Sequence, residues 1–160
     1  NQKIFDLAVS KPEYRNMGTT LAGCIIKENM LYAANVGDSR IYLICGKKIR
    51  QITVDHSYVQ ELVDMGHITK DEAAGHPNKN IITRAIGTDR SVEVDTFAYK
   101  VKGGDMVILC SDGLSNYLDE TELLAVAQKY KKPETCARHM LDAALERGGC
   151  DNISVIVLKL

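Results

Sequence analysis

Two nearly unbroken apolar runs, residues 105–110 and 153–158, constrain the fold of this chain more than any other feature. Apolar runs of this length, bounded by Gly, Asp or Asn, are typical of strands buried on both faces. An aspartate in a turn adjoins each run: Asp112 follows the first, and Asp151 precedes the second. Because strand ends hold carboxylates rigidly, we expect these two to converge on a hard cation, Mg²⁺ or Mn²⁺ rather than zinc or copper.

Three further β-rich runs precede them, at residues 20–27, 31–36 and 40–45. They are separated by Glu28-Asn29 and by Gly37-Asp38, and both pairs are typical of tight turns. The sequence therefore predicts a meander of antiparallel strands in this part of the chain.

Helical spacing of apolar residues begins after Asp55. A short helix is predicted to end at Gly66, and Thr69 with Glu72 forms a capping box that opens a second short helix. Nearer the C-terminus, Asp119 with Glu122 is a further capping box.

A longer helix is predicted from Pro133 to Gly148-Gly149, because proline favours the first turn and glycine the C-terminal end of a helix. We expect this helix and the one before it to pack on a sheet and to bring Asp151 back to that sheet. The expected buried stripe of the longer helix consists of Cys136, Ala137, Met140, Leu141, Ala144 and Leu145.

The composition is that of an ordinary globular domain. The 160 residues suffice for one domain, and 45% hydrophobic content can form a core. A net charge of −1 gives no electrostatic reason to expect a nucleic-acid or membrane partner. The five cysteines lack C-x-x-C spacing, which makes a zinc site unexpected. Cys24, Cys45 and Cys110 lie in apolar runs, where reduced thiols are expected, and this favours a cytoplasmic location.

A series of motifs in a fixed order resembles one known family. The motifs are Met17-Gly18-Thr19-Thr20, Asn35-Val36-Gly37-Asp38-Ser39-Arg40, Asp55-His56-Ser57, Thr83-Arg84-Ala85-Ile86-Gly87, Ser111-Asp112-Gly113-Leu114 and Gly149-Cys150-Asp151-Asn152-Ile153-Ser154. Together they are similar to the metal-dependent Ser/Thr protein phosphatases of the PPM (type 2C) family, in particular its bacterial single-domain branch. The resemblance implies an α+β fold, a sandwich of two antiparallel sheets flanked by helices. It also implies two Mn²⁺ or Mg²⁺ ions at one end and phosphoserine or phosphothreonine proteins as substrates.

Within this resemblance each site residue takes a role by its motif. Asp112 matches a metal-binding aspartate, Asp151 matches a ligand of the second metal, and Asn152 would orient that carboxylate; these three are the expected catalytic residues. Asp38 matches a residue that joins Asp112 at a third, weaker metal. Residues 56–80 match the flap beside the active site, which would contact the substrate protein.

One departure from the family's pattern is the bridging Asp-Gly motif expected near the N-terminus of the domain. The only Asp-Gly in this chain is Asp112-Gly113, which is already assigned. We therefore expect residues 1–160 to be the C-terminal portion of one phosphatase domain, truncated at its N-terminus. Such a chain would bind metal weakly and be inactive by itself. We expect it to self-associate, to swap strands or to hold a cleaved N-terminal piece, with the strands at 20–27 and 105–110 exposed.

Two alternatives to an enzyme remain: a pseudophosphatase that grips phosphoproteins without turnover, and an inactive fragment. Several single residues also have simpler interpretations. His56 is expected to be a partly exposed histidine with a local hydrogen bond, and Arg84 an internal ion-pair partner rather than a phosphate clamp. Asp38 could be a turn residue whose side chain bonds the neighbouring backbone. Ser39 and Ser57 lack a matched base for serine-hydrolase chemistry.

Overall fold

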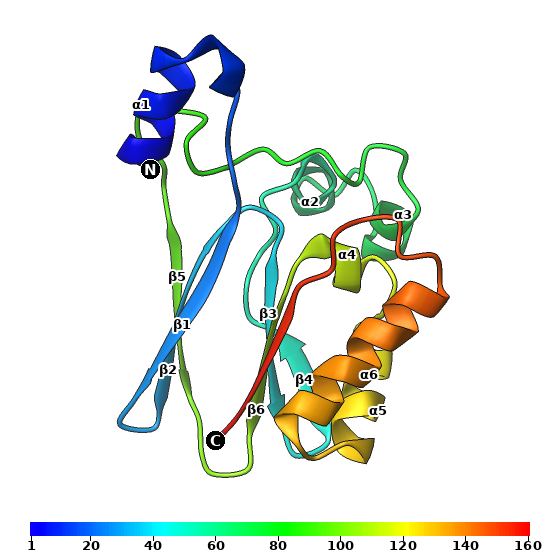
Figure 1. Ribbon diagram of the computed structural model, residues 1–160. Coiled ribbons are helices and arrows are strands. Elements are labelled where there is room, and N and C mark those ends of the chain that lie inside the picture. Colours follow the sequence, from blue (N-terminus) through cyan, green and yellow to red (C-terminus); the bar gives the residue numbers. More distant parts are fainter.

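Two antiparallel sheets face each other in the computed structural model, which describes residues 1–160 (Figure 1). The three-stranded sheet has the order β1-β2-β5, and the four-stranded sheet has the order β4-β3-β6-β7. The strands are β1 (Leu21–Lys27), β2 (Met30–Val36), β3 (Arg40–Cys45), β4 (Lys48–Gln51), β5 (Asp95–Lys100), β6 (Met106–Cys110) and β7 (Val155–Lys159). The expected sandwich of two antiparallel sheets is confirmed.

Helices flank this sandwich and are placed largely where the sequence predicts them. They are α1 (Gln2–Ser10), a 3₁₀ turn η1 (Pro12–Tyr14), α2 (Tyr58–Asp64), α3 (Lys70–Ala74), α4 (Asp112–Ser115), α5 (Glu120–Lys129) and α6 (Pro133–Glu146). Both predicted capping boxes are present, Thr69 with Glu72 and Asp119 with Glu122. None of these helices is both long enough and apolar enough to cross a bilayer.

The core has two layers, one on each face of the four-stranded sheet. Between the sheets, Leu31 of β2 packs with Ile41 of β3 and Val107 of β6. On the other face, Ile108 of β6 packs with Leu123 of α5 and Met140 of α6. All five residues of β6 are buried, so the prediction of a doubly buried strand at 105–110 is confirmed. The expectation that this strand would be exposed is wrong, because β6 lies between β3 and β7 and is covered on both faces.

The second apolar run, 153–158, is not buried on both faces. It contributes β7, which lies at the edge of the four-stranded sheet. Ile156 of this strand is 56% exposed, because β1 of the other sheet packs over β3 and β6 and does not cover the edge strand. The predicted stripe of α6 is wrong at Leu145, which is 53% exposed. Cys136, Met140 and Ala144 are spaced by four and face the sheet, and Leu145, the next residue after Ala144, turns outward.

The predicted meander holds for β1 and β2 but not for β3. Glu28 and Asn29 both have positive φ (51° and 61°), as a two-residue hairpin turn requires. The turn at Gly37-Asp38 instead carries the chain from β2 in one sheet to β3 in the other. Asp38 therefore lies at the junction of the two sheets.

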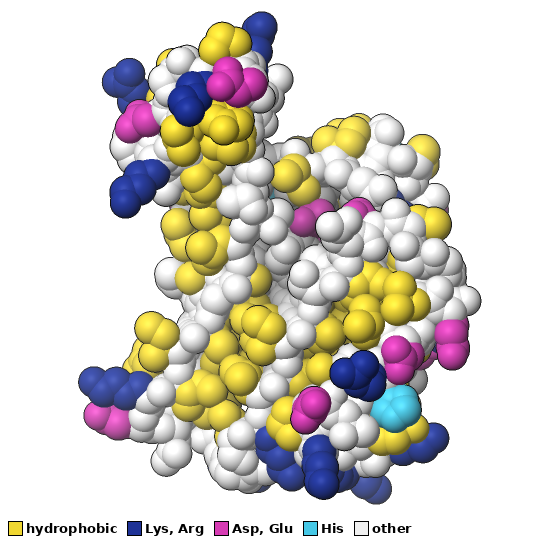
Figure 2. Space-filling model, in the orientation of Figure 1, with side chains coloured by type: hydrophobic (Ala, Val, Ile, Leu, Met, Phe, Trp, Pro, Cys, Tyr) yellow, Lys and Arg dark blue, Asp and Glu magenta, His cyan; other side chains and the backbone are white.

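The outer face of the three-stranded sheet carries exposed apolar side chains. Ile25 is 70% exposed and lies opposite Tyr32, which is 49% exposed, and Leu21 belongs to the same face. Figure 1 shows that α5 and α6 cover the four-stranded sheet, and Figure 2 shows hydrophobic side chains along β1 and between β1 and the C-terminal strand β7. Exposed apolar patches beside an unpaired edge strand are typical of association surfaces.

We therefore expect this chain to self-associate through the outer face of β1 and β2. Light scattering should show an apparent mass that rises with protein concentration, and Ile25→Lys should suppress the rise. Val9→Lys is the matched control, because Val9 is equally exposed (71%) but lies on α1. A monomer at every concentration would contradict this prediction.

Candidate metal site and cleft

The register of β6 with its two neighbours gathers three aspartates at one end of the four-stranded sheet. Arg40 of β3 pairs with Cys110 of β6, and Cys110 also pairs with Val155 of β7. Because both pairings are antiparallel, Asp38, two residues before Arg40, lies beside Asp112, two residues after Cys110. The loop that carries Asp151 enters β7 at the same end.

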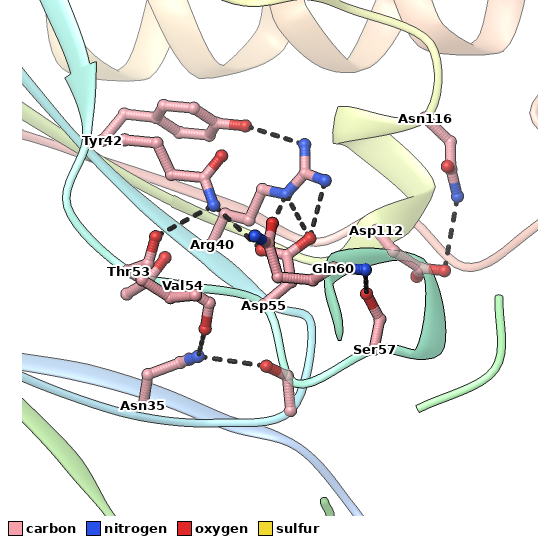
Figure 3. Close-up of polar contacts among 12 residues, drawn as sticks. Asn35, Arg40, Tyr42, Thr53, Val54, Asp55, Ser57, Gln60, Asp112 and Asn116 are labelled. Carbon is pink, nitrogen blue, oxygen red and sulfur yellow. Dashed lines mark hydrogen bonds and ion pairs between the residues drawn. The ribbon is translucent and has the colours of Figure 1, made fainter. Parts of the chain in front are cut away.

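A polar cleft of about 580 Å³ opens at this end between the sheet and the flap. Asp38 and Asp112 both line it, together with Arg40, Asp55 and Asn116. The flap contributes Ser57 and Gln60 at the start of α2, and Figure 3 shows several of these side chains around Asp112. Other residues of the segment 56–80 also line the cleft, as far as Asn80.

The negatively charged carboxylates of Asp38 and Asp112 repel each other. Burial, and then the charge of Asp112, raise the pKa of Asp38 above its ordinary value. Asp112 opens the four-residue helix α4, and its hydrogen-bond partner is the Asn116 amide at 3.4 Å. Neither carboxylate forms an ion pair. A divalent cation between them would remove this repulsion, so the donor set fits a hard metal ion.

Asp151 lies on a loop that is docked against the start of α4. The Ser111 hydroxyl donates to the Asn152 carbonyl at 3.1 Å and accepts from the Ser154 N–H at 3.0 Å. The Asp151 carboxylate accepts the N–H of Asn152 at 2.6 Å and does not line the cleft. Asn152 thus holds the Asp151 carboxylate through its backbone, and the metal role of Asp151 stays a prediction. No three His, Cys, Asp or Glu side chains gather closely enough to hold a metal by themselves.

Gly113 permits this docking because it has no side chain. A Cβ on Gly113 would lie 2.3 Å from the carbonyl oxygen of Asn152, well inside van der Waals contact. The Asp-Gly pair is therefore needed for the close approach of two backbones, as well as for the aspartate itself.

The turn that carries Asp38 is fixed by His56. The two residues His56 and Gly37 bond reciprocally: the Gly37 N–H donates to His56 Nδ1 at 3.0 Å, and the His56 N–H donates to the Gly37 carbonyl at 3.0 Å. The Asn35 amide donates to the same carbonyl. His56 is only 7% exposed, so the expectation of a partly exposed histidine is wrong; it is buried because the turn and β5 close around it.

The other ring nitrogen of His56 lies against the ion pair of Arg84 with Asp95. Nε2 lies 3.2 Å from Asp95, and Arg84 lies 2.8 Å from the same carboxylate. Burial raises the pKa of Asp95, but the bonds from His56 and Arg84 outweigh it and lower the pKa below its ordinary value. The interpretation of Arg84 as an internal ion-pair partner is confirmed.

Sequence reasoning missed the ion pair of Arg40 with Asp55, which forms the floor of the cleft (Figure 3). Two nitrogens of Arg40 reach the Asp55 carboxylate at 2.7 to 3.1 Å, and Gln51 donates to it at 2.9 Å. Burial opposes the charge of Arg40, yet its bonds to Asp55 raise its pKa. Both residues stand in the quoted motifs, but their separation along the chain gives no sign of the contact.

A further ion pair, that of Arg147 with Glu122, fixes the other end of the loop that carries Asp151. Arg147 donates to Glu122, with one contact at 2.8 Å, and to the Tyr117 carbonyl. The Tyr117 hydroxyl accepts the N–H of Cys150 at 3.0 Å. The bond from Arg147 is the largest cause that lowers the pKa of Glu122 to about 2. Residues 148–152 are therefore tied to α5 as well as to α4.

Family models and known proteins match almost the whole chain. A model described as protein phosphatase 2C matches residues 3–62, and one described as stage II sporulation protein E (SpoIIE) matches residues 64–160. The serine/threonine phosphatase Stp of Listeria monocytogenes is 41% identical over 99% of this chain and 63% of its own length.

Solved structures agree with these matches. The serine/threonine phosphatase Stp1 of Staphylococcus aureus superimposes with a TM-score of 0.95 at 37% identity, over 99% of this chain and 62% of its own. The catalytic domain of the phosphatase PstP, solved with two manganese ions, has a TM-score of 0.85 at 35% identity, over 98% of this chain and 64% of its own. The chain thus spans less than two thirds of the length of these three proteins.

We predict that Gly113→Ala destabilises the fold by about 1–3 kcal/mol, because the new methyl group forces the two backbones apart. Urea unfolding followed by circular dichroism measures the change. Gly103→Ala is the control, because a Cβ there meets no atom within 4 Å. Equal free energies of unfolding for the two variants would contradict this prediction and show that the loop around Asn152 moves aside without destabilising the fold.

The stability contributed by Glu122 should depend on pH. Its pKa of about 2 in the folded chain lies below its ordinary value of 4.5, so its contribution is present above pH 4.5 and is lost as the pH falls toward 2. Glu122→Gln keeps an acceptor for the capping box, and its stability deficit relative to the unmodified chain should shrink over that range. Glu134→Gln, in the first turn of α6 without an ion pair, should show no such trend in chemical unfolding from pH 7 to pH 2.

Proposed function

The chain belongs to the PPM (type 2C) family of metal-dependent protein phosphatases, and from this membership we propose that the complete protein hydrolyses phosphoserine and phosphothreonine in other proteins. The proposal covers a site with two Mn²⁺ or Mg²⁺ ions and a third, weaker one. The observation that carries it is the pair Asp38 and Asp112, two carboxylates that share a cleft and form no ion pair with any side chain.

Bound at this end of the sheet, divalent ions would supply an activated water and neutralise the charge of the phosphoryl group. Asp112 would hold an ion from the start of α4, Asp151 a second ion, and Asp38 would share the weaker one with Asp112. Asn152 would keep the Asp151 carboxylate oriented through the hydrogen bond already described.

The remaining groups of the site position these carboxylates. His56 and Asn35 hold the turn before Asp38, and Ser111 with Gly113 holds the loop around Asp151. The ion pair of Arg40 with Asp55 gives the floor of the cleft a fixed shape without adding net charge to it. The flap would contact the protein substrate around its phosphorylated residue.

A pseudophosphatase that binds phosphoproteins without turnover is the alternative. Hydrolysis of p-nitrophenyl phosphate in Mn²⁺ separates the two functions, measured for this chain alone and for the full-length protein of the parent gene. We expect background rates for residues 1–160 alone and clear activity for the full-length protein. Phosphopeptide binding without hydrolysis by the full-length protein would favour the alternative.

We also propose a cytoplasmic location and a role in signalling opposite a Ser/Thr kinase. The five cysteines are all free, and Cys110 and Cys136 are buried, which suits a reducing compartment. Co-expression with a Ser/Thr kinase of the same cell, followed by phosphoproteomics with and without the phosphatase, tests this pairing.

The aspartates should differ in their effect on activity. In the full-length protein, Asp112→Asn and Asp151→Asn should each lower kcat on the order of 100-fold or more, because a neutral amide cannot hold its ion. Asp38→Asn should lower kcat by about tenfold or less, because the ion that Asp38 would hold is the more weakly bound one. Exposed Asp142→Asn on α6 is the control. Wild-type rates for both Asp112→Asn and Asp151→Asn would overturn the assigned metal roles.

A further inference from the structure

The charges that line the cleft separate into an acidic part and a basic part. Arg40 and Asp55 neutralise each other, which leaves the carboxylates of Asp38 and Asp112 at the end of the sheet and that of Glu120 at the start of α5. Two lysines of the flap line the same cleft: Lys70 at the start of α3, and Lys79 in the segment that follows α3. The flap therefore presents positive charge to a cleft whose opposite part is negative.

Neither lysine has a partner within the chain. No ion pair includes Lys70 or Lys79, and no side-chain hydrogen bond involves their ammonium groups. Arg50 also borders the cleft, but its guanidinium lies over the ring of Tyr99, 5.9 Å from the ring centroid. Lys70 and Lys79 are thus the two cleft cations that remain free to meet a ligand.

We propose that Lys70 and Lys79 form a subsite for acidic side chains that flank the phosphorylated residue of a substrate protein. This inference rests on the proposed function and adds a substrate preference to it. The phosphoryl group takes the acidic part of the cleft together with the metal ions, and the chain around it passes the flap lysines.

The shared cleft limits where the acidic residue can stand. Lys70 and Lys79 line the same cleft as Asp112, so the acidic residue must stand close to the phosphorylated one, and three residues of an extended peptide span about 10 Å. The preferred substrates therefore carry Asp or Glu within about three positions of the phosphoserine or phosphothreonine. Because Lys70 is exposed and Lys79 is half-buried, their attraction for such a residue is partly screened by salt.

Three phosphothreonine peptides of equal length test the preference, with Glu, Gln or Lys at the positions within three residues of the phosphothreonine. The full-length protein should give the highest kcat/KM on the Glu peptide. Lys70→Gln and Lys79→Gln should each lower the ratio of Glu to Gln peptide by about two- to fivefold, the range of exposed ion pairs. Lys79→Glu should shift the preference toward the Lys peptide, and higher ionic strength should reduce every preference.

Two controls make the outcomes distinct. Lys131→Gln, an exposed lysine outside the cleft, should leave the ratio unchanged, and p-nitrophenyl phosphate, which has no flanking residues, should be hydrolysed at wild-type rates by all lysine variants. A loss that is equal on all substrates would show that the lysines contact the phosphoryl group itself and would overturn the inference. Equal rates on the three peptides would also overturn it while leaving the phosphatase function intact. An inactive full-length protein would instead refute the proposed function.

Discussion

The antiparallel register of β6 with β3 and β7 is the constraint on which the site depends. Because Cys110 pairs with both Arg40 and Val155, the turns beside these residues must meet at one end of the sheet. A shift of one residue in either pairing would turn every side chain of the moved strand to the opposite face, so that Ile108 and Leu109 of β6, for example, would exchange core layers. The same apolar packing that stabilises the sandwich therefore sets the distance between Asp38 and Asp112.

Short-range contacts then hold the turn of Asp38 and the loop of Asp151 in place. His56 and Gly37 join the Asp38 turn to the start of the flap, while Ser111 and the bare backbone of Gly113 receive the loop of Asp151. The bond between Gly37 and His56 is buried, so removing one partner would leave a polar group unsatisfied at a cost in free energy. The carboxylates of Asp38 and Asp112 are thus held near each other despite their mutual repulsion, which favours a cation between them.

The flap lies across the cleft from these carboxylates and has few fixed partners of its own. Its two helices, α2 and α3, are short and are held by caps at Ser57 and Thr69 more than by burial. A segment of this kind can vary its surface without disturbing the core. Substitutions of the flap lysines can therefore change the substrate preference without changing the chemistry at the end of the sheet.

The sequence alone determines most of the secondary-structure elements, whereas tertiary structure decides which sheet each strand joins and which distant side chains meet. Apolar runs, capping boxes and turn pairs predicted most elements, because hydrogen bonds within a few residues and side-chain periodicity act locally. Motif order marked Asp38 and Asp112 as partners. The crossing of the chain at Gly37-Asp38, the exposure of β7 and the ion pair of Arg40 with Asp55 were not predictable, because each depends on which sheet a strand joins. That choice is made by long-range packing, and a strand's own residues do not encode it.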